Sequence, residues 1–521
     1  MQNNMNRFYR IDTAYNYRKS LYEGFMKKIS LLLIVSFIFA LIFAQEGEQS
    51  SFIFKMKVHE YRLNNGLKLL VVQRDTPTVS CQLWFDVGSV NDPEGLSGAA
   101  HLFEHMMFKG TRIIGTKNYE EEKPLLDETV RIMRLHDSEC MKDEPDYAVL
   151  EALKQEYSRV VRKLNEIQMK REFWDILEMQ GATEINASTS FDWTEYHYSL
   201  PANKLEVWAW IERDRLKNLV LREFYAERDV VLEEMRTSLF DSAWGRVYAE
   251  LRAIAFIEHP YRRPIIGFRR DIRFADPDEL LAHLKRHYVP MNCVAVVVGG
   301  VKPDEVYTLV ERYFGDIENP SEPPPKPKAV EPEQNSERRA IIRAPFKKRL
   351  ILGFHRPELT NPDFAPLELL TLILSYGRSS RLYKALVKEK KLAASVDCWN
   401  RDSKYPDLFI IRALPTSEHT NAEVEAAVLA EIEKVKKEGV TASELEQAKK
   451  KSLFGIASAL DSNSSIAWQL GYYQCTAGDW RFIYRAEENI KKVTKEDIIR
   501  VANKYFKPSN MSVVYLEESS K

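Results

Sequence analysis

Five consecutive residues, His101-Leu102-Phe103-Glu104-His105, restrict the fold of this chain more tightly than any other segment. In an α-helix, side chains at positions i and i+4 lie on the same face, so His101 and His105 would point at one place. Glu104 would lie near that place without being a ligand itself. Burial of these polar groups among apolar neighbours is unfavourable unless a metal ion satisfies them together. The segment therefore predicts a metal-binding helix, and the alternative is a helix whose histidines have no ligand role.

A second pair, His283 and His287, has the same spacing in different surroundings. Lys285 and Arg286 lie between these two histidines and would repel a cation, and no carboxylate accompanies them. We interpret this pair as part of a solvated helix face.

The order of the first motif, with the glutamate directly before the second histidine, is that of the inverted zincins. The surrounding segment, residues 98–111, resembles the active-site segment of the M16 peptidases, the family of pitrilysin, insulinase and the mitochondrial processing peptidase. Further segments resemble that family in the same order: Asn186-Ala187-Ser188-Thr189, residues 227–234, His259-Pro260-Tyr261 and Tyr288-Val289-Pro290-Met291-Asn292. The resemblance covers nearly the whole mature chain and is strongest in its first half.

This resemblance implies an α+β fold of two similar halves, each a mixed or antiparallel sheet covered by helices, as in the LuxS and processing-peptidase type of metallohydrolase. A content of 45% hydrophobic and 29% charged residues suits such a globular protein. We expect a zinc-binding peptidase domain over residues 56–318 and a Pro-rich linker over 319–338. A peptidase-like domain without a zinc motif would follow over residues 339–521.

Residues 119–174 depart from the family pattern. They are charged and favour helix, and their apolar residues recur at roughly heptad spacing. We predict an inserted helical hairpin in the first half.

A catalytic zinc ion usually has three protein ligands and a water. Glu227 and Glu234 fall at positions i and i+7 of a helix expected near residues 223–237. The resemblance implies that Glu234 is the third ligand beside His101 and His105, and that Glu227 supports the ligands from behind. Glu233 is turned about 100° away and should be solvated. The alternative is an acidic surface helix without function.

The resemblance further implies one Zn²⁺ per chain, with Glu104 as the general base of peptide hydrolysis. It makes Asn186, Ala187 and Ser188 part of an edge strand that an extended peptide joins by backbone hydrogen bonds, the alternative being a purely structural strand. The expected activity is that of a zinc metalloendopeptidase acting on peptides or small unfolded polypeptides. A non-catalytic assembly or scaffold subunit is the second class considered.

Active sites of the family are completed by an arginine and a tyrosine from the second half, in a segment resembling Leu-Arg-x-x-x-x-Leu-x-Tyr. Here Val387 falls at the arginine and Ala394 at the tyrosine. Neither side chain can position a substrate or stabilise an oxyanion. We therefore predict a heterodimer with a related subunit that supplies the Arg/Tyr pair, unless this segment is misaligned.

The net charge of −1 gives no indication of a nucleic-acid partner. The five cysteines form no Cys-x-x-Cys pair, so neither a disulfide framework nor a thiolate zinc site is indicated, although a single disulfide remains open.

The N-terminus resembles a leader. Lys27-Lys28 precede an apolar run at residues 29–44, which predicts a signal peptide over residues 1–44, with Met26 as an alternative start. We expect an exported, periplasmic or secreted protein without membrane association beyond this leader. An uncleaved N-terminal anchor is the alternative.

Overall fold

The computed structural model describes residues 55–519, so the predicted leader lies outside the described part of the chain. Residues 55–519 contain no helix with both the length and the apolar character that a membrane crossing requires. All five cysteines lie in this range, and none forms a disulfide.

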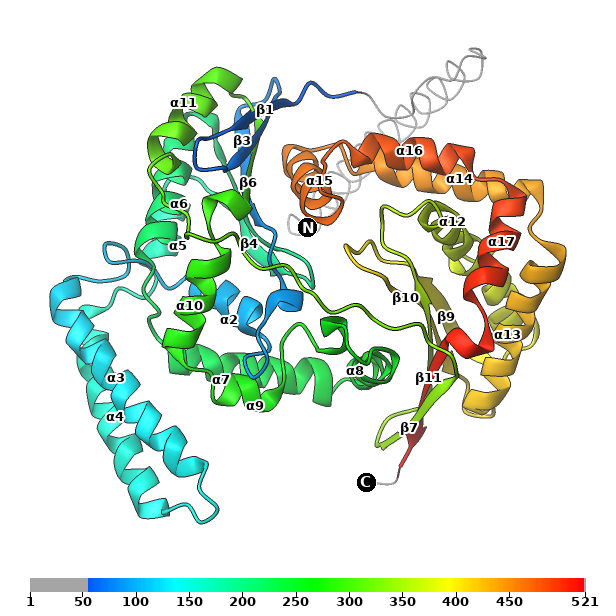
Figure 1. Ribbon diagram of the computed structural model, residues 1–521, viewed down its shortest axis with the longest axis horizontal. Coiled ribbons are helices and arrows are strands. Elements are labelled where there is room, and N and C mark those ends of the chain that lie inside the picture. Colours follow the sequence, from blue (N-terminus) through cyan, green and yellow to red (C-terminus); the bar gives the residue numbers. More distant parts are fainter. Residues whose placement is uncertain (1–54, 520–521) are drawn as a thin grey trace, which may run out of the picture. The chain divides into compact units, whose positions relative to one another are not determined.

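The first half contains a six-stranded sheet (Figure 1). Its strands, in spatial order, are β1 (His59–Arg62), β2 (Lys68–Gln73), β6 (Cys293–Gly299), β3 (Thr78–Phe85), β5 (Thr194–Pro201) and β4 (Thr183–Thr189). β2 and β6 run parallel and the other neighbours are antiparallel. β1 and β2 form a hairpin whose turn includes Gly66 at φ 89°, a backbone conformation that favours glycine.

The second half repeats this arrangement without a counterpart of β1. Its strands, in spatial order, are β7 (Arg338–Ala344), β11 (Met511–Glu518), β8 (Arg349–Arg356), β10 (Asp407–Pro415) and β9 (Ala393–Trp399). The parallel pair, β7 with β11, occupies the place that β2 and β6 hold in the first sheet. The two halves therefore share one topology, although their sequences show little repetition.

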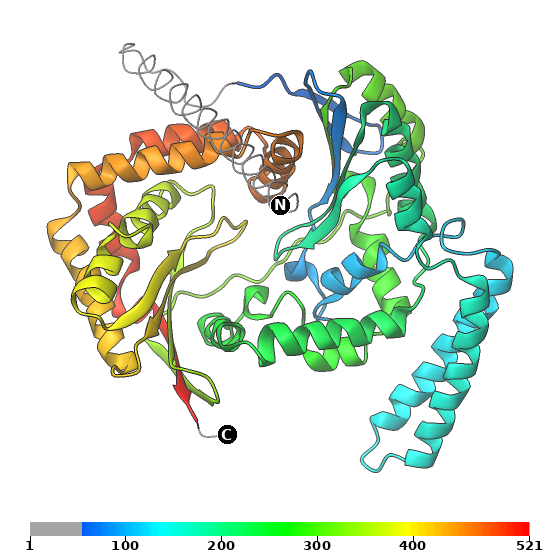
Figure 2. The same ribbon diagram turned by 180° about the vertical axis from the view of Figure 1, so that it is seen from behind.

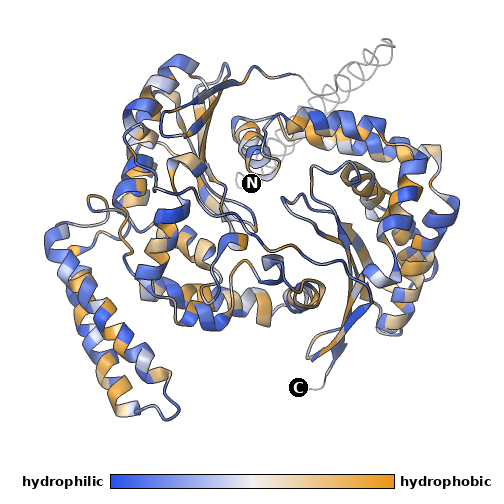
Figure 3. Cartoon of the chain, viewed as in Figure 1, coloured by the Kyte–Doolittle hydropathy of each residue, from blue (hydrophilic) through white to orange (hydrophobic). Residues whose placement is uncertain are grey.

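Helices cover one face of each sheet. In the first half these are α2 (Ala99–Met106), α5 (Glu172–Met179), α6 (Leu205–Asn218), α7 (Phe224–Met235), α9 (Arg269–Arg273), α10 (Pro277–His287) and α11 (Pro303–Phe314). In the second half they are α12 (Phe364–Ser375), α13 (Asn421–Glu438), α14 (Ala442–Ser458), α16 (Phe482–Lys492) and α17 (Lys495–Tyr505). Each set encloses its own apolar core against its sheet, and apolar residues run along the strands of both sheets (Figure 3).

The opposite face of each sheet is covered by a helix from the other half. α8 (Ala243–Ala255) packs Val247 and Leu251 against Ile351 and Leu408 of the second sheet. α15 (Asn463–Thr476) packs Leu470 on the first sheet, and its neighbour Gly471 lies so close to Trp84 that an added Cβ would be 2.2 Å from the indole Nε1. This reciprocal packing joins the two halves.

The hairpin consists of α3 (Tyr119–Cys140) and α4 (Tyr147–Ile167) and extends away from the sheets in both views (Figures 1 and 2). Asp146 starts α4 by accepting hydrogen bonds from the backbone N–H groups of Ala148 and Val149. The expected insertion ran to residue 174, whereas the helix ends at Ile167 and α5 returns Phe173 to the first core. The predicted α+β class with two similar halves and an inserted hairpin is confirmed.

The Pro-rich stretch contains no helix or strand between α11 and β7. Within it, the carboxylate of Glu331 accepts hydrogen bonds from the consecutive backbone N–H groups of Ile257, Glu258 and His259. Short 3₁₀ turns occur at Ser89–Asn91, Ala202–Lys204, Pro260–Arg262, Pro290–Asn292 and Pro508–Asn510, and π-helical segments at Arg236–Phe240 and Tyr383–Glu389.

Candidate metal-binding site

Helix α2 carries His101, Glu104 and His105. Gly98, at φ 86°, turns the chain into the helix. The buried carboxylate of Asp92 accepts hydrogen bonds from the backbone N–H groups of Gly98 at 2.7 Å and Ala100 at 3.0 Å, which satisfies donors that a helix N-terminus leaves free. The opposite face of α2 is buried in the first core through Leu102, Phe103 and Met106. Both histidines therefore lie on the face toward α7.

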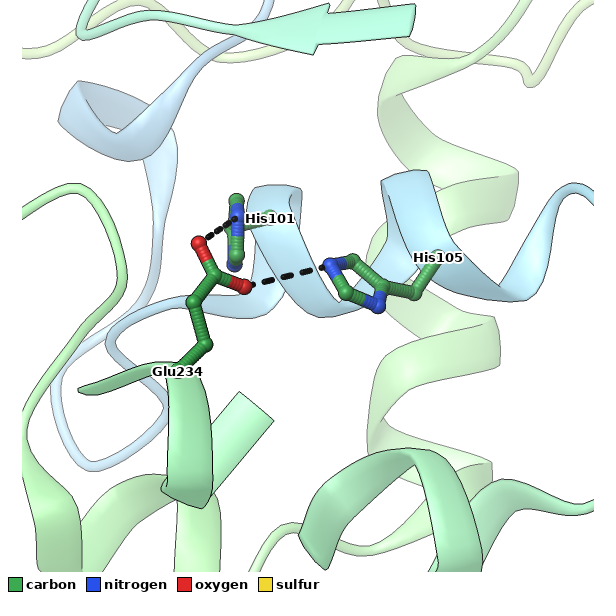
Figure 4. A group of neighbouring side chains, drawn as sticks. All are labelled: His101, His105 and Glu234. Carbon is green, nitrogen blue, oxygen red and sulfur yellow. Dashed lines mark ion pairs between the residues drawn. The ribbon is translucent and has the colours of Figure 1, made fainter. Parts of the chain in front are cut away.

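Helix α7 supplies the carboxylates. Its buried residues Val231 and Met235 anchor it in the first core, and Glu234 faces the two histidines (Figure 4). Oε1 of Glu234 lies 3.6 Å from Nε2 of His101, and Oε2 lies 3.5 Å from Nε2 of His105. Glu233 points to solvent, as expected, and pairs with Arg236 there.

The facing atoms of His101, His105 and Glu234 all lie within 4.8 Å of one another. Among residues 55–519, they form the single cluster of three or more His, Cys, Asp or Glu side chains close enough to share an ion. Two imidazoles and one carboxylate are a typical ligand set of catalytic zinc. The geometry and the donor types therefore fit a zinc ion.

The protonation of the two histidines differs. Burial lowers the pKa of His101 to about 4, so its ring is neutral at pH 7. Its Nδ1 is buried and has no hydrogen-bond partner in the part of the chain that the structure describes. Burial acts in the same direction on His105, but the carboxylates of Glu227 and Glu234 outweigh it and raise the pKa of His105 to about 9. Without a metal, a proton on His105 balances the carboxylates that surround it. A cation among the three facing side chains would replace that proton.

Glu227 lies behind His105. Its Oε2 is 3.3 Å from Nδ1 of His105, on the ring edge opposite the nitrogen that faces Glu234. A carboxylate there fixes the orientation of the ring and favours the tautomer whose Nε2 is free to bind a metal.

Glu104 is outside the ligand cluster and faces the sheet. Its Oε2 accepts a hydrogen bond from the hydroxyl of Thr189, at the end of β4, at 2.5 Å. Burial raises the pKa of Glu104, an effect that the Thr189 hydroxyl partly offsets and nearby Glu195 reinforces.

The structure places Asn186, Ala187 and Ser188 in β4, which lies at the edge of the first sheet and, within residues 55–519, pairs with β5 alone. Asn186 is exposed, whereas Ala187 is buried in the first core. A register shift between Thr183 and Asn186 contains Glu184 at φ 57°. The strand therefore has one unpaired edge, and it ends beside Glu104.

The interpretation of His283 and His287 as a solvated face is wrong. These side chains are buried in α10, with only 6% and 3% of each residue exposed, while Lys285 and Arg286 between them point to solvent. Burial lowers the pKa values of the two histidines to about 3 and about 4, so both rings are neutral. Packing of α10 against α2, which the local sequence does not reveal, accounts for the difference.

Comparison with known proteins identifies the family. A model of the insulinase family, peptidase family M16, matches residues 69–132, and a model described as the M16 inactive domain matches residues 275–452. The zinc protease PqqE of Helicobacter pylori is 26% identical over 462 residues, which are 87% of this chain and 91% of that protein. The chain belongs to the M16 peptidase family.

Two further relatives of this M16 chain show how far the likeness extends. A crystal structure of a protease from Helicobacter pylori superposes with a TM-score of 0.75 at 26% identity, covering 89% of this chain and all of that one. A probable mitochondrial-processing peptidase subunit beta from Arabidopsis thaliana is 24% identical, covering 87% of this chain and 76% of that protein.

In the second half of this M16 chain, the apolar residues Val387 and Ala394 lie in two different elements. Val387 lies in the π-helical segment and packs against the second core. Ala394 is exposed on the edge strand β9. The nearest arginine in the sequence, Arg381, is held by the carboxylate of Glu444, with both contacts at 2.7 Å.

Sequence reasoning missed three polar residues around the site. Thr189 was recognised as part of a family-like segment but given no role, although it holds Glu104. Asp92 and Lys109 were not singled out, yet one caps α2 and the other pairs with Glu227. A short-range signal existed only for Asp92, which precedes a glycine-rich turn into the helix.

Proposed function

We propose that this protein is a zinc metallopeptidase that hydrolyses peptides or small unfolded polypeptides. His101, His105 and Glu234 would bind one zinc ion per chain, and Glu104 would act as the general base. The observation that carries this proposal is the approach of one ligand atom each from His101, His105 and Glu234 to within 4.8 Å of one another, with the carboxylate of Glu104 on the helix that carries both histidines. The names of the relatives, zinc proteases among them, agree with it.

When bound, the zinc ion would polarise a peptide carbonyl and make a bound water more acidic. The residues of the chain have separate tasks. Glu227 contacts Nδ1 of His105, so that Nε2 would be free to bind the ion. Thr189 engages Oε2 of Glu104, which leaves Oε1 as the atom proposed to take a proton and return it to the leaving amine. Burial raises the pKa of Glu104, which is the direction that favours uptake of a proton by this carboxylate.

Substrate would pair with β4. An extended peptide can add to the unpaired edge of a sheet through backbone hydrogen bonds, which tolerate many side chains. Asn186, Ala187 and Ser188 offer that edge, and Thr189 ends it beside Glu104. The scissile bond of a peptide paired there would lie near the proposed general base.

We infer that activity needs a partner subunit of related fold. Val387 and Ala394 provide no guanidinium or phenol, and the ion pair of Arg381 with Glu444 occupies its side chain. A partner would supply the Arg/Tyr pair that stabilises the oxyanion. Purified alone, the chain should bind zinc and cleave peptides poorly, and the partner should restore cleavage. Full activity from a verified monomer would contradict the heterodimer.

A scaffold role is the second candidate, since a model described as an inactive domain matches residues 275–452. Zinc content and a chelator-sensitive peptide assay, measured on the native assembly, separate the two. In the Glu104→Gln variant zinc should be retained while hydrolysis falls by roughly a hundredfold or more. Hydrolysis at the wild-type rate would remove Glu104 from the mechanism.

Residues 56–318 and 339–521 would be the two peptidase-like domains, joined by residues 319–338. The apolar run of residues 29–44 supports export to the periplasm or the medium. Sequencing of the N-terminus of the native protein tests both cleavage and the alternative anchor.

A further inference from the structure

Lys109 lies just beyond α2 and contacts the carboxylates of Glu227 in α7 and of Glu223 directly before α7. Its Nζ is 2.5 Å from Oε1 of Glu227 and 3.4 Å from Oε2 of Glu223. The other oxygen of Glu227 is the atom that faces Nδ1 of His105. Lys109 and His105 therefore hold the same carboxylate, each by one oxygen.

This arrangement is partly shielded from water. The side chains of Lys109, Glu227 and His105 are 21%, 14% and 22% exposed. Ion pairs with little exposure are screened less than surface pairs, and loss of one partner leaves the other charge poorly compensated. Without Lys109, the carboxylate of Glu227 would have one fixed neighbour in place of two, and could rotate away from His105.

Glu223 supports the other side of Lys109. It begins α7 at φ 54°, a left-handed conformation that is unfavourable for a residue with a Cβ and needs support from its surroundings. Lys109 and Lys170 both pair with its carboxylate. Lys170 follows the hairpin helix α4, so the α3–α4 hairpin contributes to the group.

A second contact ties the hairpin to the same turn of α7. Asp137 of α3 accepts a 2.7 Å hydrogen bond from Nη1 of Arg228, the residue next to Glu227. Both Asp137 and Arg228 are buried. The segment of α7 that carries Glu227 is therefore fixed by the hairpin as well as by Lys109.

We propose that Lys109 is a positioning residue of the metal site: by bridging Glu223 and Glu227 it holds Glu227 against His105, so that His105 presents Nε2 to the ion. Two residues complete this support: Lys170, which follows α4, and Asp137, near the end of α3. The inference rests on the proposed metal site and adds residues that bind neither the metal nor the substrate.

The direction in which zinc affinity changes when Lys109 is removed distinguishes a positioning role from simple charge repulsion. A lysine near a Zn²⁺ site repels the ion, so its removal would tighten zinc binding if Coulomb effects alone operated. If Lys109 positions Glu227, its removal weakens zinc binding instead. Partners of metal ligands typically contribute tenfold to a hundredfold in affinity, so we expect a loss of roughly tenfold for Lys109→Met.

The experiment measures the zinc dissociation constant of the full chain by competition with a chromophoric chelator, for wild type, Lys109→Met and Lys109→Arg. Arginine keeps the charge and should retain affinity within about threefold. Lys68→Met is the matched control, because Lys68 is equally buried, at 18% exposure, and pairs with Glu60 away from the site. The melting temperature of each metal-free variant reports whether it folds.

A double-mutant cycle with Glu227→Gln tests the route. If Lys109 acts through Glu227, Lys109→Met should change zinc affinity little in the Glu227→Gln background. Unchanged or tighter binding by Lys109→Met, or an equal loss in both backgrounds, overturns the proposal. If Lys109→Met does not fold, Glu223→Gln removes the other end of the bridge and should weaken zinc binding in the same sense, or the proposal fails. A wild-type chain that binds no zinc would instead refute the metal site itself.

Discussion

The hydroxyl of Thr189 donates a 2.5 Å hydrogen bond to Oε2 of Glu104, which joins the edge strand β4 to the proposed general base. The two residues are separated by the whole α3–α4 hairpin in the sequence. The hydrogen bond would therefore fix the carboxylate that takes the proton relative to the strand that binds the peptide. Thr189 would orient Glu104 relative to the substrate backbone.

Replacing Thr189 with valine should reduce kcat by about tenfold while zinc content stays at the wild-type level. Valine keeps the shape of threonine but cannot donate, so Oε2 of Glu104 loses its partner and the carboxylate its fixed orientation. Steady-state kinetics on the active assembly, with zinc analysis of the same preparation, measures the effect.

Thr183→Val is the matched control, because Thr183 lies at the other end of β4 and is exposed. It should leave kcat unchanged. Equal losses in the two variants would mean that the strand, and not the bond to Glu104, matters.

Removal of metal should abolish peptide hydrolysis and lower the melting temperature. A ligand bound to the folded state stabilises it in proportion to the logarithm of its concentration over its dissociation constant, by about 2.7 kcal/mol at a hundredfold excess. Dialysis against a chelator, followed by titration with Zn²⁺ and thermal unfolding, gives both readings. His101→Ala should show the low melting temperature with or without zinc, and a normal response of this variant to zinc would exclude His101 as a ligand.

The residues of the site differ in how far the sequence could predict them. His101 and His105 follow from helix geometry alone, since their spacing is local. Glu234 required a family resemblance, because its approach to them depends on packing of α7 against α2 across the inserted hairpin. Thr189 and Lys109 act through contacts between distant segments, which no local pattern records. The same limit explains the error at His283 and His287, because the packing of their helix, α10, against α2 is a contact between distant segments.

The fold, like the site, could be predicted from the sequence only in part. The helices of the α3–α4 hairpin could be predicted from the heptad-like spacing of their apolar residues. The reciprocal placement of α8 and α15 could not, because both helices leave their own half and pack on the other sheet. No amphipathic pattern specifies which of two sheets a helix covers.

Gly471 provides a test of this reciprocal packing. Replacement of a helical glycine by alanine normally stabilises a protein by up to about 1 kcal/mol. At Gly471 the added Cβ would meet the Trp84 indole at 2.2 Å, so α15 must move away from the first sheet. We expect Gly471→Ala to lower the free energy of unfolding by about 2 kcal/mol, as for overpacking in other cores.

Gly455 of α14 is the control, since nothing lies within 4 Å of a Cβ added there. Gly455→Ala should be neutral or stabilising in urea unfolding. If both variants behave alike, α15 does not pack tightly on Trp84.

Asp363 should make stability depend on pH in the acid range. It lies before α12 and accepts hydrogen bonds from Lys504 and Tyr505 at 2.7 Å and from Arg500 at 2.5 Å. Burial alone would raise its pKa, but these partners outweigh burial and lower the pKa of Asp363 to about 2. Because the folded pKa lies below the unfolded value of about 3.9, this carboxylate stabilises the fold above pH 4 and loses its contribution as the pH falls toward 2.

Asp363→Asn should therefore cost about 1 kcal/mol at pH 7, after allowance for solvent screening, and much less near pH 2. Asp127→Asn, which removes an exposed partner of Lys123, is the control and should leave stability at pH 7 almost unchanged. Urea unfolding of the wild type and the two variants between pH 7 and pH 2.5 measures these differences. If the cost of Asp363→Asn stays constant over this range, the charge of Asp363 does not stabilise the contact between α12 and α17.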